Sequence, residues 1–255
     1  MITLASNLSG LLWLLLMLAP LLILQRWLHR EIQAVFLILT RRPALTIGLF
    51  AFLFFPGVAL HETSHFLMAR LLGVRTGRFS LLPKMLPDGR LRMGYVETDP
   101  ADFLREALIG VAPLLSGGAS VAYIGINRLG LAPLADAIQM SAWSNFGTML
   151  LQLPRQPDFW LWFYLAFTIS STMFPSASDR RGWLPVTLII LGLAVIALLA
   201  GAGPWLAANL APALNIFLTS LATVFAISLL PHVALALPVG LLRRAISRFT
   251  GVTIS

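Results

Sequence analysis

Long apolar segments constrain this chain more than any other feature of its sequence. A helix needs about 20 apolar residues to cross about 30 Å of hydrocarbon. Six segments approach that length: 10–28, 44–73, 103–126, 158–176, 184–203 and 212–240. Because 58% of the residues are hydrophobic and only 11% are charged, the chain is too apolar for a soluble globular domain. The sequence therefore predicts an all-α polytopic membrane protein with about six transmembrane helices, folded as one integral domain over residues 1–255.

Two connections between these segments have features of their own. Residues 75–100 form the main polar stretch, in which Pro87-Asp88-Gly89 is a turn signal and apolar residues alternate with others from Leu91 to Val96. This alternation favours a small β-hairpin between the second and third helices. Residues 32–40 are apolar but too short to cross a membrane, so we expect a separate interfacial helix there.

Basic residues outnumber acidic ones by 18 to 10 and lie mainly at the edges of the apolar segments. This placement indicates contact with a lipid bilayer and not with nucleic acid. Six spans would put both termini on one side. If that side is cytoplasmic, it carries most of the basic residues, as the positive-inside rule requires, although four arginines of the first connection would lie outside. We therefore expect cytoplasmic termini, and the arginine-rich composition suggests a prokaryotic cell membrane.

An HExxH motif, His61-Glu62-Thr63-Ser64-His65, lies inside the second apolar segment. Ionisable residues are costly at membrane depth and by default mark a functional site. Residues i and i+4 share one face of a helix, so both imidazoles can bind one ion while Glu62 lies beside them. Since the chain has no cysteine, histidine and carboxylate must supply the ligands. The motif predicts Zn²⁺ bound by His61 and His65, with Glu62 as the general base.

A catalytic zinc ion usually has three protein ligands and one open position, so a third ligand is required. A helix entering near Pro43 reaches His61 after roughly 27 Å, which places the motif near the cytoplasmic face. Asp179 follows the fourth span, and two helix crossings return it to the same face. Other candidates lie at the wrong end of a span, at an uncertain depth or on the opposite side: His29, His232, Asp136 and Asp158. We therefore expect Asp179 to be the third ligand.

Taken together, HExxH and residues 171–180 resemble the site-2 protease family of intramembrane zinc metalloproteases. That family carries HExxH near the cytoplasmic end of one core helix and an aspartate in an Asn/Pro-rich LDG-type motif at the end of another. Pro175 precedes Asp179 by four residues, close to the family pattern. Serine or threonine replaces the usual asparagine, Ser178 replaces the leucine and Arg180 the glycine.

Two further features extend the resemblance over residues 44–183, which we take as the core. The segment 110–117 is similar to the family's Gly-Pro-x-x-Asn segment, which packs beside the metal helix. The hairpin at 75–100 matches the position of β-structure in the family. No PDZ-like domain is inserted, so the chain resembles a minimal member.

The resemblance implies hydrolysis of peptide bonds in transmembrane protein substrates, with the active site towards the cytoplasmic side. Zn²⁺ held by His61, His65 and Asp179 would activate water, and Glu62 would take its proton. The hairpin edge at residues 78–96 could hold an unwound substrate as an added strand.

Two other functions stay open. The degenerate second motif suggests a non-catalytic zinc-binding subunit of a larger membrane complex, which would need membrane partners. A membrane zinc transporter is the other alternative. Such carriers commonly pair HExxH with HNxxD on a second helix, and this chain has no such motif and only four histidines.

Overall fold

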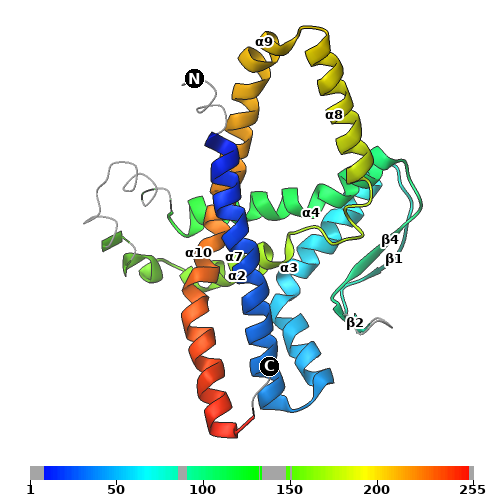
Figure 1. Ribbon diagram of the computed structural model, residues 1–255. Coiled ribbons are helices and arrows are strands. Elements are labelled where there is room, and N and C mark those ends of the chain that lie inside the picture. Colours follow the sequence, from blue (N-terminus) through cyan, green and yellow to red (C-terminus); the bar gives the residue numbers. More distant parts are fainter. Residues whose placement is uncertain (1–8, 86–90, 132, 134–147, 150, 253–255) are drawn as a thin grey trace.

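The structure, a computed structural model, describes residues 9–85, 91–131, 133, 148–149 and 151–252 (Figure 1). Four long helices, two shorter ones and a small β-structure account for most of it. In chain order the elements are α2 (Ser9–Thr40), α3 (Pro43–Leu71), β1 (Thr76–Ser80), β2 (Lys84–Met85), β3 (Leu91–Arg92), β4 (Tyr95–Thr98), α4 (Phe103–Tyr123), η1 (Ile124–Arg128), η2 (Leu153–Arg155), α7 (Phe159–Thr172), α8 (Trp183–Leu199), α9 (Gly203–Trp205), η3 (Leu206–Leu210) and α10 (Ala211–Thr250).

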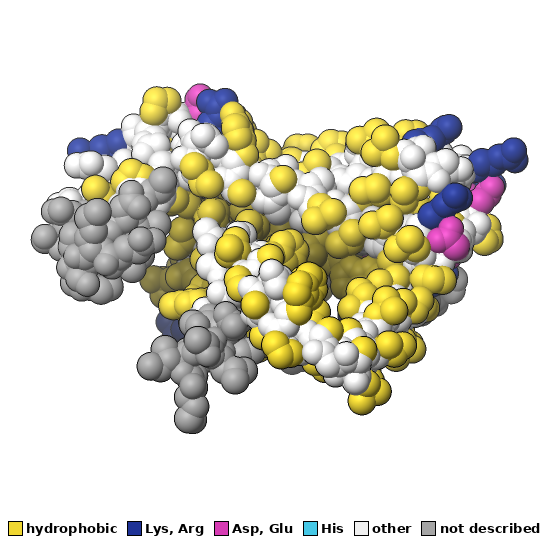
Figure 2. All heavy atoms as spheres, turned by 90° about the horizontal axis from the view of Figure 1, so that it is seen from above, with side chains coloured by type: hydrophobic (Ala, Val, Ile, Leu, Met, Phe, Trp, Pro, Cys, Tyr) yellow, Lys and Arg dark blue, Asp and Glu magenta, His cyan; other side chains and the backbone are white. Residues whose placement is uncertain are grey.

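Four of the described helices are long and apolar enough to cross a membrane: α2, α3, α4 continued by η1, and α10 with the short turns before it. This agrees with the prediction of a mostly helical membrane protein. The count of six spans is not confirmed, because α7 has 14 residues and α8 has 17, fewer than the about 20 that a span needs. Hydrophobic side chains cover most of the face shown in Figure 2, and charged ones gather at its edges.

The helices α2 and α10 run parallel and in contact over most of their length (Figure 1). Near their starts, the Gly10 N–H donates to Asn215 Oδ1 at 2.7 Å, and further along, Arg243 Nη1 donates to Glu31 Oε1 at 2.6 Å. Two parallel helices that both span a membrane end on the same side. The start of α2 and the end of α10 therefore lie at opposite ends of the pair, and the expectation that both termini share one side is not supported.

Residues 32–40 form the last part of α2, so the prediction of a separate interfacial helix is wrong. No proline or glycine occurs between Leu21 and Thr40, and nothing in this stretch ends the helix. Ile32 belongs to a buried apolar cluster with residues of α3 and α7, and Glu31 is paired with Arg243. Packing and charge pairing thus stabilise residues 32–40 as a continuation of α2, although the length of this segment alone suggested an interfacial position.

The polar stretch at 75–100 contains the expected antiparallel β-structure. β1 pairs with β4, with an irregular register between Thr76 and Phe79, and β2 pairs with β3. The predicted turn at Pro87-Asp88-Gly89 falls outside the described residues. The β1–β4 pair lies along α3, where the ring centroids of Phe66 and Phe79 are 5.9 Å apart. One strand pair therefore runs beside the helix that carries HExxH.

Glycine brings α7 close to α3 at the level of the motif. A Cβ at Gly57 of α3 would overlap the Thr168 carbonyl oxygen and the Thr172 hydroxyl. With no side chain at Gly57, the C-terminal turn of α7 can lie against α3 one turn before His61. The loop that follows α7 starts beside the HExxH residues for this reason.

Candidate metal centre

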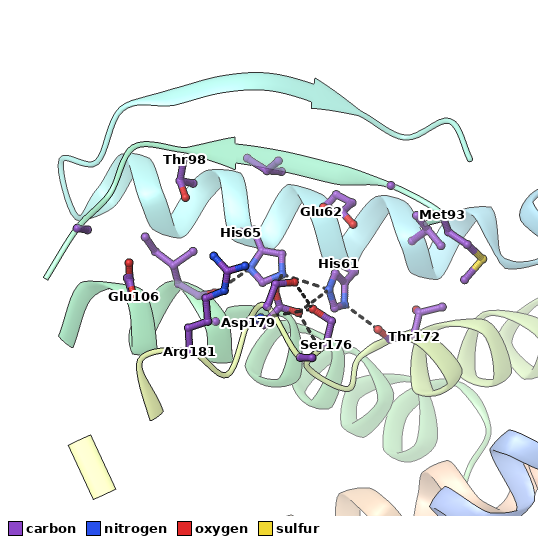
Figure 3. A pocket seen from close by; sticks show the side chains of 18 of the residues that line it. His61, Glu62, His65, Met93, Thr98, Glu106, Thr172, Ser176, Asp179 and Arg181 are labelled. Atoms are coloured by element: carbon purple, nitrogen blue, oxygen red, sulfur yellow. Dashed lines mark hydrogen bonds and ion pairs between the residues drawn. The ribbon is translucent and has the colours of Figure 1, made fainter. Parts of the chain in front are cut away.

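His61 and His65 project from one face of α3 towards Asp179, which lies in the loop between α7 and α8 (Figure 3). The two Nε2 atoms are 3.1 Å apart. Asp179 Oδ1 lies 3.4 Å from His65 Nε2, and Asp179 Oδ2 lies 3.7 Å from His61 Nε2. One ligand atom from each residue lies within 4.8 Å of the other two, so this group could hold a metal ion.

Backbone carbonyls fix the orientation of both imidazoles. His61 Nδ1 lies 2.7 Å from the Thr172 carbonyl oxygen, and His65 Nδ1 lies 2.8 Å from that of Ile109. A carbonyl oxygen can only accept, so each Nδ1 carries the hydrogen and the neutral ring presents a lone pair at Nε2. Metal-binding histidines are held in this way by a partner on their second nitrogen.

The donor set fits a cation. The two facing Nε2 lone pairs and the Asp179 carboxylate are all acceptors, and acceptors that converge in a largely buried site repel one another unless a positive charge lies between them. A proton or a metal ion can supply that charge. Two imidazole nitrogens and one carboxylate form a ligand set found in catalytic zinc sites, which keep a fourth position open.

The loop that carries Asp179 is held by its own backbone. The Ser176 N–H donates to Asp179 Oδ2 at 2.7 Å. Burial acts to raise the pKa of the Asp179 carboxyl, but hydrogen bonds from His61, His65 and Ser176 outweigh burial and hold this pKa well below its usual range when a proton on an imidazole Nε2 supplies the positive charge. The carboxyl group is therefore ionised and able to act as a ligand.

Two glycines dock this loop on α4. A Cβ at Gly110 would overlap the carbonyl oxygen of Asp179, and a Cβ at Gly182 would overlap the Phe103 carbonyl oxygen. The backbone around the carboxylate thus lies directly on the surface of α4. The resemblance suggested that segment 110–117 packs beside the metal helix, and the structure agrees, because the hydroxyls of Ser116 and of Ser64 in the HExxH motif lie 2.5 Å apart. Gly110 of the same segment also contacts the backbone of the third candidate ligand.

Replacing Gly110 by alanine is expected to push the Asp179 loop away from α4 and to weaken metal binding by about 10-fold or more, because ligand orientation depends on such supporting contacts. Gly118→Ala on the same helix is the matched control, since a Cβ there meets only Val224 Cγ1 at an ordinary 3.6 Å. Zinc affinity measured by competition with a chelating dye separates the two variants. Equal affinities would show that the close approach at Gly110 is not needed.

The three candidate ligands border a cavity of about 780 Å³ between α3, the β-structure, α4 and the loop after α7. Glu62 also lines this cavity and is 9% exposed. A Cβ at Gly94 would come within 2.8 Å of Glu62 Cγ, so the absent side chain leaves room for the carboxylate. Glu106 and Arg181 line the other end of the cavity (Figure 3). The sequence predicted His61, Glu62, His65 and Asp179 as site residues, but not Glu106 or Arg181.

The remaining candidates for a third ligand lie away from this group. His29 packs against the rings of Phe50 and Phe54, and His232 contacts Ser228 and Ser171. Asp158 precedes the first turn of α7, about 20 Å along that helix from the turn that contacts His61. Asp136 falls outside the described residues. The structure therefore brings Asp179 to the two histidines and none of the other described candidates.

Comparison with known protein families, with curated proteins and with solved structures finds no match to this chain.

Proposed function

We propose that this chain is an intramembrane zinc metalloprotease that hydrolyses peptide bonds of transmembrane protein substrates. The observation that supports this most directly is the convergence of His61 Nε2, His65 Nε2 and the Asp179 carboxylate, with Glu62 on the same cavity. These four side chains are the set that an HExxH hydrolase needs. The resemblance of the two motifs to the site-2 protease family points to the same reaction.

His61, His65 and Asp179 would hold the metal through one atom each. When bound, Zn²⁺ would lower the pKa of a water molecule towards about 7 and polarise the scissile carbonyl. The Glu62 carboxylate would accept the proton of that water and pass it to the leaving amine. The Thr172 and Ile109 carbonyls keep both Nδ1 atoms protonated, which leaves both Nε2 atoms available to the metal.

The β-structure offers a place for the substrate backbone. A transmembrane helix must unwind before its peptide bonds can be attacked, because its carbonyls are already hydrogen-bonded. Met93, Gly94, Val96 and Thr98 line the cavity on the side of β4. We propose that an unwound substrate segment pairs with the edge of this β-structure within residues 78–96. The basic residues around the hairpin favour the cytoplasmic side of a prokaryotic cell membrane for the site.

Metal removal tests the proposal. Purified protein in lipid nanodiscs is expected to contain zinc, to cleave a transmembrane peptide, to lose cleavage when a chelator removes the zinc and to regain it when zinc is returned. Zinc content is measured by atomic emission and cleavage by mass spectrometry of the products.

The outcomes separate the alternatives. Stoichiometric zinc without cleavage of any transmembrane peptide would favour a non-catalytic zinc-binding subunit of a membrane complex. Zinc that crosses the bilayer of sealed vesicles would favour a transporter. Protein that binds no divalent metal would overturn the proposed function.

A further inference from the structure

Three other helices contact the C-terminal turn of α7, which lies beside the metal centre. The last carbonyls of a helix have no partner within the helix. Here the Ser171 carbonyl accepts from Gln25 Nε2 of α2 at 2.5 Å, and the Thr172 carbonyl accepts from His61 Nδ1 of α3 at 2.7 Å. The Ser171 hydroxyl lies 3.0 Å from His232 Nε2 of α10. Two adjacent residues therefore join α2, α3 and α10.

The hydroxyl of Ser171 differs from its neighbours in the direction of its hydrogen bond. The hydroxyls of Thr168, Ser170 and Thr172 all donate to carbonyls of α7 itself. The described partner of the Ser171 hydroxyl is the imidazole of His232 on another helix. This bond therefore fixes the end of α7 relative to α10, whereas the others only stabilise α7.

His232 is built to accept this hydrogen bond. Its Nδ1 lies 2.8 Å from the Ser228 carbonyl oxygen and must carry the hydrogen, which leaves Nε2 as an acceptor for the Ser171 O–H. His232 is completely buried and Ser171 is 3% exposed. The imidazole also packs on Phe167, with ring centroids 5.0 Å apart. If the Ser171 O–H moved away, the buried Nε2 acceptor of His232 would lose its described donor, which costs free energy. This cost keeps the two side chains in a defined geometry.

We propose that His232 is a positioning residue of the metal centre, acting through Ser171 on the Thr172 carbonyl that orients His61. The inference rests on the proposed metal site. The orientation of the His61 ring matters there because its Nε2 atom must face the metal. If the end of α7 moves, the Thr172 carbonyl no longer holds the hydrogen on Nδ1. His61 can then place its hydrogen on Nε2 and lose the lone pair that would bind the metal.

The first test needs no metal. The chain has only four histidines, so ¹⁵N-histidine labelling gives a simple imidazole spectrum. In the unaltered protein without metal, we expect the neutral His61 ring to carry its hydrogen on Nδ1. In His232→Ala and in Ser171→Ala we expect a mixture of both tautomers at His61, while His65, held by Ile109 of α4, stays unchanged.

The second test measures the metal centre itself, with Co²⁺ as a visible probe. We expect His232→Ala to weaken Co²⁺ binding by about 10-fold, at the low end of the loss typical of residues that support metal ligands, and to shift its absorption bands. The double variant of Ser171 and His232 should show no further loss, because both act through one hydrogen bond. His232→Gln, which keeps an acceptor, should restore part of the affinity.

Ser170→Ala is the matched control, since it removes a buried hydroxyl of the same helix whose described hydrogen bonds stay within α7. We expect it to leave the His61 tautomer and the Co²⁺ spectrum unchanged. If His232→Ala does not fold, Ser171→Ala, which removes a single oxygen, decides the question. Unchanged tautomer and unchanged Co²⁺ binding in these variants would overturn the inference. If the unaltered protein binds no metal, the proposed function fails, and the tautomer of His61 still decides the role of His232.

Discussion

Replacing Glu62 by glutamine is expected to lower the rate of cleavage of a transmembrane peptide by about 10²–10⁴-fold, the usual contribution of general acid–base catalysis. Glutamine keeps the shape of the side chain that fits against Gly94 but cannot accept a proton at neutral pH. Bound zinc should remain, because Glu62 is not one of the three converging ligands. The measurement pairs single-turnover cleavage with zinc content on the same preparation.

Glu97→Gln is the control for a general effect of removing a carboxylate near the site. Glu97 lies on β4 between two residues that line the cavity, and its side chain instead accepts from the Arg78 N–H. Its replacement should leave the chemical step unchanged. Full activity of Glu62→Gln would rule out Glu62 as the base, and loss of zinc in that variant would assign Glu62 to the metal centre instead.

Replacing Asp179 by alanine is expected to weaken zinc binding by more than the 10–100-fold that follows loss of a supporting partner, and to abolish cleavage. Only the two imidazoles, whose Nε2 atoms are 3.1 Å apart, would then remain of the three converging ligands, and no carboxylate ligand would offset the charge of the metal. Zinc affinity is measured by competition with a chelating dye, which reports binding without any substrate.

Asp99→Ala provides the comparison for Asp179→Ala. Asp99 lines the same cavity but lies outside the group that could hold a metal ion. It should keep the zinc affinity of the unaltered protein. Undiminished zinc binding in Asp179→Ala would show that the third ligand is a different group, whatever happens to activity.

The site residues were predictable because local and topological rules both apply to them. His61 and His65 are one helical turn apart, so a helix at that position is enough to bring them together. The prediction for Asp179 depended on which membrane face each loop reaches. The structure places Asp179 opposite the histidines, although α2 and α10 do not support the six-span topology on which that prediction was based.

The supporting contacts could not be predicted. The partners of His61 and His65 are main-chain carbonyls of Thr172 and Ile109, and every residue type carries such a carbonyl. The docking of the Asp179 loop depends on the missing side chain of Gly110, and glycine in an apolar helix has many uses. Ser171 and His232 are 61 residues apart, and neither spacing nor hydropathy connects them.

The count of six spans is not confirmed, because hydropathy alone does not separate a span from a shorter buried helix such as α7. Six consecutive residues of α7, 166–171, are all buried, so this part of the helix is surrounded by protein on several sides. Hydropathy measures how apolar a segment is, and a helix buried among other helices can be as apolar as one that faces lipid. Length distinguishes the two, and α7 ends at Thr172 before reaching the length of a span.

The use of main-chain oxygens to hold both imidazoles has a consequence for mutagenesis. Exchanging the side chains of Ile109 or Thr172 leaves the accepting oxygen in place, so an alanine scan would register changes in packing there and miss the contribution to ligand geometry. Replacing the amide that follows either residue by an ester, which weakens the carbonyl as an acceptor, would expose it. The tolerance of these two positions to substitution is therefore a poor guide to their importance.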